Sequence, residues 1–249
     1  WFKETGAKFT IQVSILKDIA TLTIDTSGEG LHKRGYRLES VEAPIKETLA
    51  AALVQLSFWN HERVLVDPFC GSGTIAIEAA MIGKNIAPGI QRNFVSEEWP
   101  RVKKEYWKDE RISARKAIIQ DRDLKIIASD IDKKAAKIAE ENAFEIGVDD
   151  CIEFKTEDVL NLKLNDEYGV IISNPPYGER IGEKKEVEKL YRGIGKKFNK
   201  LDTWSIYILT SNTGFEKLYG KKADRRRKLF NGRIKVDYYQ YYGPRPPRK

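Results

Sequence analysis

The sequence predicts an α/β fold of the Rossmann-like type, with a mainly parallel sheet and helices on both of its faces. Residues 63–67 have the pattern of a short buried strand, and they lead through a glycine-rich turn, 68–74, into an apolar helical stretch, 75–82. This order of strand, turn and helix opens the sheets of nucleotide-binding α/β proteins. Along the rest of the chain, short apolar runs alternate with helical patterns, which is typical of a parallel sheet.

Two elements are predicted before the glycine turn. Residues 8–25 alternate apolar and polar side chains around Lys17-Asp18, as a β-hairpin does. Residues 25–30 are rich in turn-forming types, and we place a domain boundary near them. Residues 44–58 predict a helix, and the apolar residues that recur on one of its faces are Ile45, Leu49, Leu53 and Leu56.

After the glycine turn, Gly83 can end the first helix as a C′ residue. Residues 84–123 form an insertion with many charges, and we interpret its aromatic residues Phe94, Trp99 and Trp107 as packing groups. The next strand, 124–130, ends in an aspartate. A helix follows over 131–146 and ends at Gly147; its inward residues are predicted to be Ile131, Ala135, Ile138, Ala139 and Ile146.

The C-terminal half supplies four further strands and one helix. Strands are predicted over residues 152–155, 169–173 and 204–210, and a helix with one apolar face runs through 187–198. Asn231-Gly232 favours a tight turn into a long final strand, 233–241. This closing hairpin predicts an antiparallel edge strand on the otherwise parallel sheet.

Composition narrows the class of protein. A chain of 249 residues fits one large domain with a small appendage. Hydrophobic residues make up 41% and charged residues 33%, as in soluble globular proteins, and no apolar run approaches the ~20 residues of a membrane span. Two cysteines and two histidines argue against a disulfide scaffold, a zinc site or another metal centre. We expect a cytoplasmic protein without a bound metal.

The charge distribution favours an anionic partner. The net charge is +7 and the pI is near 9.2. Much of the excess lies in residues 221–228, which predict a basic loop that contacts nucleic-acid phosphates through Arg225, Arg226, Arg227 and Lys228. The alternative interpretation is a solvated loop without a partner.

Asn174-Pro175-Pro176-Tyr177, directly after the apolar run 169–173, is the most informative motif. Each proline fixes its own φ and removes a backbone donor, so a stiff turn presents two acceptors, the Asn174 side-chain oxygen and the Pro175 carbonyl. The Tyr177 ring stands beside them. This set suits a planar substrate with an exocyclic amine, whose N–H groups bind the acceptors while the ring stacks on its face. The alternative is a proline-rich turn with a core tyrosine.

The glycine turn indicates a cationic ligand. Gly71, Gly73 and Ala76 satisfy the loose G-x-G-x-x-G/A spacing of dinucleotide-binding turns. The carboxylate of Asp67 would repel a pyrophosphate, however, and would attract an ammonium group. S-adenosylmethionine has an amino-acid head and no phosphate, and it fits this requirement.

These residues carry a family resemblance. Residues 67–74 together with 174–177 resemble the paired motifs of the class I S-adenosylmethionine-dependent amino-methyltransferases. The chain further resembles the guanine-N2 methyltransferases of large-subunit ribosomal RNA in residues 31–37, 43–50, 92–94, 98–100, 174–180 and 230–232. The resemblance covers nearly the whole chain. It implies the seven-stranded sheet of class I methyltransferases and methyl transfer to the exocyclic N2 amine of a guanosine in ribosomal RNA, 23S rRNA in particular.

The resemblance also implies a domain organisation. Members of that family carry an RNA-binding THUMP module before the catalytic domain. Residues 1–30 are then a hairpin and linker left from this upstream region, and 31–249 are the methyltransferase domain. The chain begins at Trp1 without an initiator methionine and therefore resembles a catalytic fragment.

The ligand is expected across the carboxyl ends of the strands. Asp67 and the turn after it would hold the methionine end, Asp130 would accept hydrogen bonds from the ribose, and the resemblance gives Asp158 the adenine amine. The full set of predicted cofactor residues is Asp67, Phe69, Cys70, Gly71, Ser72, Gly73, Thr74, Asp130, Ile131, Asp158 and Asn174. The predicted catalytic residues are Asn174, Pro175, Pro176 and Tyr177, and Arg180 joins the basic loop in contacting RNA.

Three alternatives remain open. An N6-adenine DNA methyltransferase would share Asn-Pro-Pro-Tyr, but such enzymes usually carry a sizeable target-recognition domain, which we do not find. A glutamine methyltransferase acting on release factors tends to have an aliphatic residue at the position of Gly178. A non-catalytic RNA-binding scaffold would not need Asp67, Gly71, Gly73 and Asn174 intact.

Overall fold

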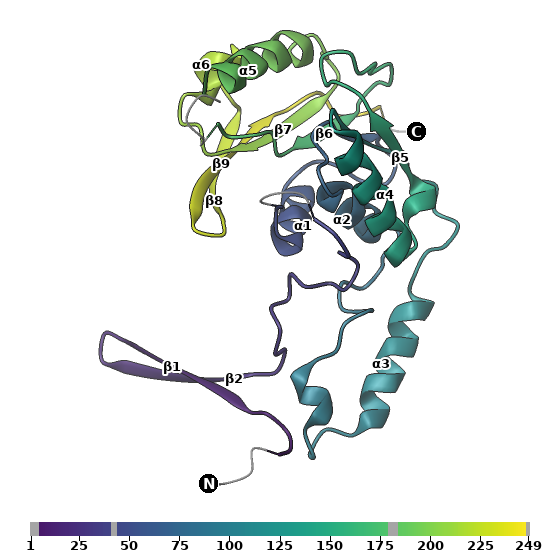
Figure 1. Cartoon of the computed structure of the whole chain (residues 1–249), viewed down its shortest axis with the longest axis vertical. Coiled ribbons are helices and arrows are strands. Elements are labelled where there is room, and N and C mark those ends of the chain that lie inside the picture. Colours follow the sequence, from purple (N-terminus) through teal and green to yellow (C-terminus); the bar gives the residue numbers. More distant parts are fainter. Residues whose placement is uncertain (1–4, 41–43, 179–183, 248–249) are drawn as a thin grey trace.

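A seven-stranded sheet forms the centre of the structure (Figure 1). The computed structural model describes residues 5–40, 44–178 and 184–247. The strand order is β5-β4-β3-β6-β7-β9-β8; the first five strands of this order are parallel, and β9 runs antiparallel to both of its neighbours. The strands are β3 (Leu65–Asp67), β4 (Ile126–Asp130), β5 (Ile152–Thr156), β6 (Val170–Ser173), β7 (Ser205–Thr210), β8 (Arg225–Asn231) and β9 (Ile234–Tyr241). The predicted mainly parallel sheet with an antiparallel edge is confirmed.

Helices cover both faces of this sheet, also as predicted. Successive strand residues point to opposite faces, so Leu65 belongs to one hydrophobic core and Val66 to the other. The first core contains side chains of α1 (Glu47–Gln55), α2 (Thr74–Gly83) and α4 (Lys133–Ile146). The second contains side chains of α5 (Lys184–Phe198) and α6 (Phe215–Tyr219). The short α6 and the 3-10 turn η2 (Asp149–Cys151) carry too few residues for a periodic signal and were not predicted.

Two predictions about helix ends are wrong. Gly83 is the last residue of α2 rather than a left-handed cap, and the left-handed residue that follows is Asn85, with φ 56°. A Cβ at Gly83 would lie 2.8 Å from a methyl carbon of Leu124, so a larger residue would displace that side chain. Ile131 precedes α4 instead of facing inward from it, and its side chain is 72% exposed. Gly147 does end α4 in the left-handed conformation, with φ 71°.

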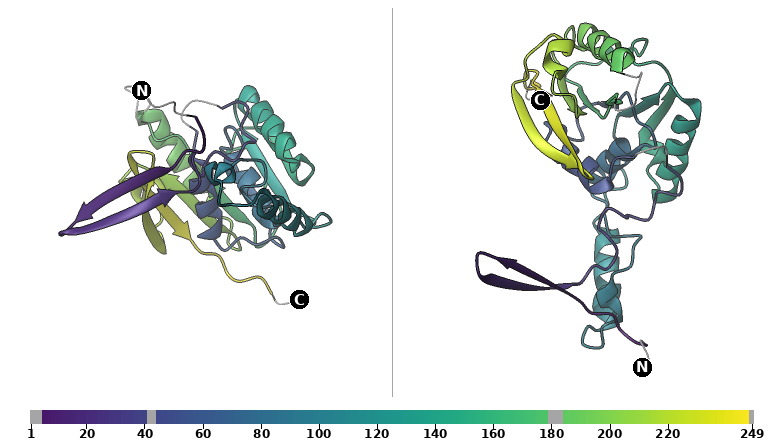
Figure 2. Two further views of the ribbon diagram at one scale, coloured as in Figure 1. Left: turned by 90° about the horizontal axis from the view of Figure 1, so that it is seen from below. Right: turned by 60° about the vertical axis from the view of Figure 1, so that its left-hand side comes forward.

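An extension carries the N-terminal hairpin and the insertion away from the sheet (Figure 2). It comprises β1 (Thr10–Leu16), β2 (Ile19–Asp25), the 3-10 turn η1 (Val95–Glu98) and α3 (Lys104–Lys116). The aromatic residues of the insertion pack as predicted: Phe94 stacks on Trp107, and Trp99 stacks on Phe9 next to the hairpin. The hairpin turns at Lys17 and Asp18, which both have positive φ.

The basic segment was predicted as a loop, but its residues 225–228 belong to the edge strand β8. Its residues pair with β9 in a continuous register from Arg225↔Gln240 to Asn231↔Ile234. Leu229 packs against the first core, and Arg226 lies 3.8 Å from the carboxylate of Asp237. Its consecutive charged residues do not show the alternation of apolar and polar side chains that predicts a strand, because an edge strand has little apolar surface to bury.

No helix in the described part of the chain combines the length and apolar character that crossing a membrane requires.

Candidate active site

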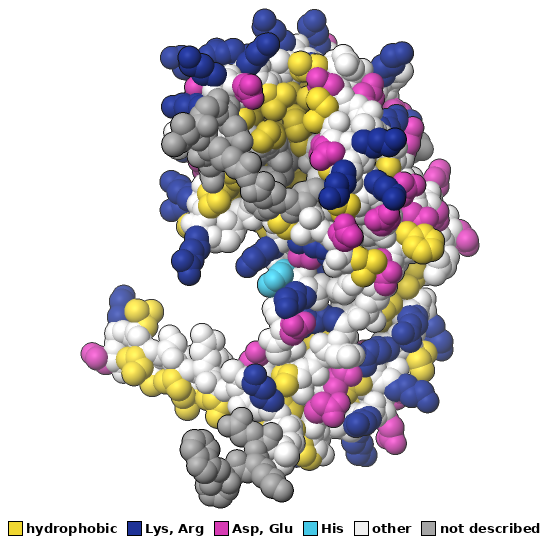
Figure 3. Space-filling model, viewed as in Figure 1, with side chains coloured by type: hydrophobic (Ala, Val, Ile, Leu, Met, Phe, Trp, Pro, Cys, Tyr) yellow, Lys and Arg dark blue, Asp and Glu magenta, His cyan; other side chains and the backbone are white. Residues whose placement is uncertain are grey.

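A cleft of about 720 Å³ opens at the carboxyl ends of β3, β4 and β6. Its size is typical of small-molecule sites. On the face shown in Figure 3, apolar side chains gather in the upper part of the molecule, and basic side chains border them above and to the left. The predicted site residues that line the cleft are Asp67, Phe69, Cys70, Gly71, Ser72, Thr74, Asp130, Ile131, Asp158, Asn174, Pro175, Pro176 and Tyr177.

Asp67 ends β3 with a buried carboxylate that borders the cleft. Its side chain is 1% exposed, Oδ1 accepts a hydrogen bond from the Phe69 N–H at 3.3 Å, and Oδ2 has no partner within the described residues. Burial raises the pKa of Asp67 to about 8; the nearby Asp130 carboxylate adds to this rise, and the Phe69 N–H opposes it. A buried carboxylate with an unpaired oxygen is stabilised by a cation.

Asp67 should make the ligand-free protein less stable as the pH rises. The carboxyl titrates near 3.8 when unfolded and near 8 when folded. Between these values the folded state binds more protons, so the free energy of unfolding falls with increasing pH. Asp67→Asn should remove this contribution. Urea unfolding at several pH values, with the exposed Asp121→Asn as control, checks it; parallel profiles for wild type and Asp67→Asn would contradict the assignment.

The glycine turn is held against the end of β4. The Gly71 N–H donates to Asp130 Oδ2 at 2.9 Å, and the Cys70 N–H donates to the Ser129 carbonyl at 2.9 Å. Gly71 has φ 52°, which favours glycine. The Cys70 side chain is buried and its pKa is raised, mainly by burial, so it is a packing residue rather than a nucleophile.

Gly73 lies behind the cleft instead of lining it. It precedes α2 with φ 82°, and a Cβ there would lie 2.9 Å from the Cβ of Ala139 on α4. Gly73 therefore allows the turn to approach α4 closely, while its neighbours form the cleft wall.

Asp158 lies in the wall after β5, where its Oδ1 also accepts the Leu160 N–H at 2.8 Å.

Asn174-Pro175-Pro176-Tyr177 follows β6 and also lines the cleft. The Tyr177 hydroxyl donates to Asn174 Oδ1 at 2.6 Å. The Pro176 carbonyl accepts from the hydroxyl of Tyr191 on α5 at 2.8 Å. The predicted amide acceptor and aromatic ring are therefore adjacent, and the second lone pair of Asn174 Oδ1 can accept a further hydrogen bond. Arg180, predicted to contact RNA, lies outside the described residues.

The structure adds wall residues that the sequence patterns did not single out: Pro44, Ile45, Leu190, Asn231 and Ile234. Arg37 links two segments of this wall, because it donates hydrogen bonds to the Ile45 carbonyl and to Thr74 Oγ1, both at 2.8 Å. These residues come from segments far apart in the chain, and their local patterns predicted a helix, a turn or a strand but no place in the site. Among the described residues, no group of three His, Cys, Asp or Glu side chains could hold a metal ion.

Comparison with known proteins gives the family. Residues 34–240 match the UPF0020 family, described as the RMKL-like methyltransferase domain. A Bacillus subtilis (strain 168) relative named "Putative RNA methyltransferase YpsC" is 57% identical over 250 residues, which span 100% of this chain and 65% of the relative. "Ribosomal RNA large subunit methyltransferase K/L" of Shewanella sp. (strain W3-18-1) is 39% identical over 243 residues, spanning 95% of this chain and 34% of the relative.

A solved structure agrees with both the fold and the family. The crystal structure of SMU.472, described as "a putative methyltransferase complexed with SAH", superimposes with a TM-score of 0.91 at 49% identity, covering 98% of this chain and 64% of that one. This chain thus spans between 34% and 65% of the lengths of these three proteins. The family match includes every strand of the central sheet except the last residue of β9. The chain belongs to the family of RMKL-like methyltransferase domains.

Proposed function

We propose that this domain transfers a methyl group from S-adenosylmethionine to the exocyclic N2 amine of a guanosine in ribosomal RNA, 23S rRNA in particular, in the cytoplasm. One observation carries the proposal: the Asn174 amide and the unpaired carboxylate oxygen of Asp67 border the same cleft. The names of the relatives, an RNA methyltransferase and a large-subunit ribosomal RNA methyltransferase, support RNA as the substrate. The SAH bound to SMU.472 supports the methyl donor.

The cleft residues fit S-adenosylmethionine chemically. The buried Asp67 carboxylate suits the ammonium of its amino-acid head, and Gly71, Ser72 and Thr74 line the same cleft. The Oδ2 atom of that carboxylate has no competing partner among the described residues. Asp130 and Asp158 provide further acceptors along the wall. When bound, the donor supplies a methyl group already activated by the positive charge of its sulfonium.

The motif after β6 would then hold the amine that is methylated. Asn174 Oδ1 and the Pro175 carbonyl accept its N–H groups, which favours the pyramidal geometry that a delocalised amine needs for attack. The Tyr177 ring stacks on the base, as aromatic side chains do in single-stranded RNA recognition. As the N–CH3 bond forms, the S–CH3 bond breaks and S-adenosylhomocysteine leaves. The methylated amine is then cationic and acidic, so it can release a proton to solvent, and no strong base is required; the domain acts through positioning and electrostatics.

Radiolabelled methyl transfer tests the proposal. The protein is incubated with tritiated S-adenosylmethionine and, separately, with unmodified ribosomal RNA, DNA and a release-factor protein. We expect label in RNA only, and nucleotide mapping should place it on N2 of a guanosine. Label in DNA adenine or in protein glutamine would replace the proposal with one of the alternative activities. Binding of SAH and RNA without any transfer would indicate a non-catalytic scaffold.

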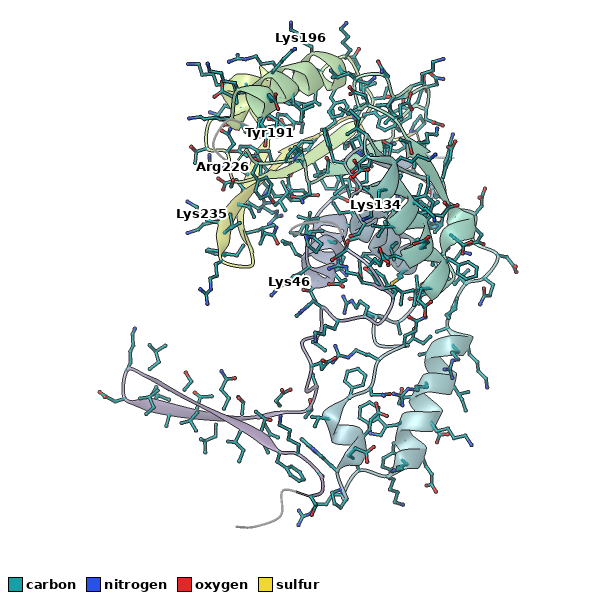
Figure 4. The ribbon with its side chains drawn as sticks, in the orientation of Figure 1. Lys46, Lys134, Tyr191, Lys196, Arg226 and Lys235 are labelled. Atoms are coloured by element: carbon teal, nitrogen blue, oxygen red, sulfur yellow. The ribbon has the colours of Figure 1, made fainter. Side chains whose placement is uncertain are left out.

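We further propose that the basic residues of β8 contact RNA phosphates. Arg226 is half exposed, and Figure 4 shows it on the hairpin formed by β8 and β9, near Lys235. Residues of a strand alternate between its faces, so Arg226 and Lys228 share one face while Arg225 and Arg227 share the other. Arg226 and Lys228 are both exposed, whereas Arg227 is partly buried, so we expect the pair Arg226 and Lys228 to contact successive phosphates of the RNA.

Replacing Arg226 and Lys228 with alanine should therefore flatten the salt dependence of RNA binding. Each lost phosphate contact on single-stranded RNA lowers the log–log slope by about 0.7, so the double variant should lose about 1.4. Filter binding at several salt concentrations measures this slope. The matched control replaces two basic residues outside the cleft, Lys104 and Lys108 on α3, with alanine. A slope equal to that of wild type would show that β8 makes no phosphate contact.

The hairpin of β1 and β2 supports the proposed domain boundary near residue 30. One of its faces is apolar and open to solvent, with Ile11, Val13, Ile15, Leu22 and Ile24 all more than half exposed. A two-stranded hairpin is marginally stable by itself. We propose that this face packs within an upstream THUMP-containing region. A Val13→Cys thiol should label more slowly when that region is present; equal labelling rates would exclude such packing.

A further inference from the structure

We infer that Tyr191 is a positioning residue for methyl transfer, because it fixes the motif after β6 through a buried chain of hydrogen bonds. The inference rests on the proposed function of that motif. Tyr191 lies on α5, between the helix and the sheet (Figure 4), and its side chain is completely buried. Its hydroxyl donates to the Pro176 carbonyl at 2.8 Å and lies 2.8 Å from Thr210 Oγ1.

The direction of each hydrogen bond follows from proton count. The Tyr191 hydroxyl has one proton, and the Pro176 carbonyl can only accept it. Thr210 must therefore donate its own proton to the Tyr191 oxygen. The Asn212 N–H in turn donates to Thr210 Oγ1 at 3.1 Å. The chain thus runs from the loop after β7, through a buried threonine and a buried tyrosine, to the carbonyl of Pro176.

These hydrogen bonds fix the part of the motif that the two prolines leave free to rotate. Each proline ring locks its own φ, and Pro176 also restricts the ψ of Pro175, but the ψ of Pro176 remains free to rotate. On the strand side, β6 is held by its pairing with β7, up to Ser173↔Ile208. On the far side, the Tyr191 bond fixes the carbonyl of Pro176, and with it the peptide plane that leads into Tyr177. The Asn174 amide and the Pro175 carbonyl lie between these two anchors.

The residue that follows the motif also lies close to α5. Gly178 has φ 74°, and a Cβ there would lie 3.2 Å from the Cβ of Val187. The helix therefore bonds the motif at Pro176 and leaves little room for a side chain at Gly178. Because small displacements of reacting groups can cost much of the rate, loosening this support should slow methyl transfer without removing any group that touches the substrate.

Tyr191→Phe tests the inference, because it removes one hydroxyl and keeps the ring. Tyr219→Phe is a matched control: the Tyr219 hydroxyl is buried without a hydrogen-bond partner in the described structure, and both rings pack on Phe215. We expect Tyr191→Phe to lower kcat on ribosomal RNA about tenfold with unchanged SAH affinity. Tyr219→Phe should retain the wild-type kcat. Equal kcat values in all three proteins, or equal losses in both variants, would overturn the inference.

Further variants separate positioning from a general loss of packing. Thr210→Val should lower kcat as Tyr191→Phe does, and Thr210→Ser, which keeps the hydroxyl, should retain the wild-type kcat. In an Asn174→Ala background, Tyr191→Phe should have no further effect, because its role acts through the motif. A further loss of about tenfold in that background would show that Tyr191 acts by another route.

One readout does not depend on the methylated substrate. Hydrogen exchange at the Tyr177 and Gly178 amides should accelerate in Tyr191→Phe and stay at the wild-type rate in Tyr219→Phe. Unchanged exchange in Tyr191→Phe would refute the anchoring itself. A wild-type protein that fails to methylate ribosomal RNA would instead refute the proposed function, and the exchange comparison would still decide whether Tyr191 holds the motif.

Discussion

Asn174→Ala should abolish most methyl transfer while leaving the affinity for SAH nearly unchanged. The amide oxygen is expected to hold the amine during attack, and it lies in the cleft at the end of β6. Removing one preorganised hydrogen-bonding group from a reacting centre costs about 2.7–4 kcal/mol in the barrier, by analogy with oxyanion-hole donors. Single-turnover rates with tritiated donor, together with calorimetric SAH binding, measure the two quantities separately.

Two controls sharpen this result. Asn161→Ala removes an exposed amide outside the cleft and should leave the rate unchanged. Tyr177→Phe keeps the stacking ring but removes the hydroxyl that donates to Asn174 Oδ1 at 2.6 Å. It should retain most of the activity, since the Asn174 amide and the aromatic ring both remain. A folded Asn174→Ala protein with more than about a tenth of the wild-type rate would remove Asn174 from the catalytic role.

Asp67→Asn should weaken SAH binding rather than slow the bound enzyme. The substitution keeps the shape of the side chain and removes the charge that is expected to pair with the ligand ammonium. Losing one partner of a buried charge pair costs about 2–5 kcal/mol, which corresponds to a loss of affinity of about 30-fold or more. Isothermal calorimetry measures this loss, and Asp121→Asn provides an exposed carboxylate control.

Proton release gives a second measurement of the same interaction. The pKa of Asp67 is raised to about 8 in the ligand-free protein, mainly by burial. A bound ammonium favours the ionised form, so binding below this pH should release a proton, and SAH affinity should rise as the pH approaches 8. Calorimetry in buffers of different ionisation enthalpy detects the released proton. Wild-type affinity and wild-type proton release in Asp67→Asn would exclude Asp67 from the ligand site.

Local patterns in the sequence determined most of the sheet and the centre of the site. The apolar runs that became β3, β4 and β6 are short, continuous and bounded by turn residues, so they predict buried parallel strands. Asp67 and Asn174 each stand at or directly after the end of such a run. Because the carboxyl ends of parallel strands meet at one edge, sequence position alone placed these two residues in a common cleft.

Other features depended on contacts between distant segments. Arg225 to Lys228 form an edge strand because β9 offers them a hydrogen-bonding partner, whereas their charges resemble a solvated loop. Gly83 faces the side chain of Leu124, which lies beyond the whole insertion in the sequence. No local pattern encodes such a neighbour.

The support of the active motif was likewise decided only by tertiary structure. Tyr191 fits a helical apolar stripe, so its sequence context predicts a core residue and gives no role to its hydroxyl. Folding brings that hydroxyl to Pro176 and Thr210, on two different segments of the chain. Similarly, the sequence supplied the carboxylate of Asp67, but its burial and its unpaired oxygen follow from how β3, the glycine turn and β4 pack together. The sequence thus determines which groups reach the cleft, and packing determines their protonation and their alignment.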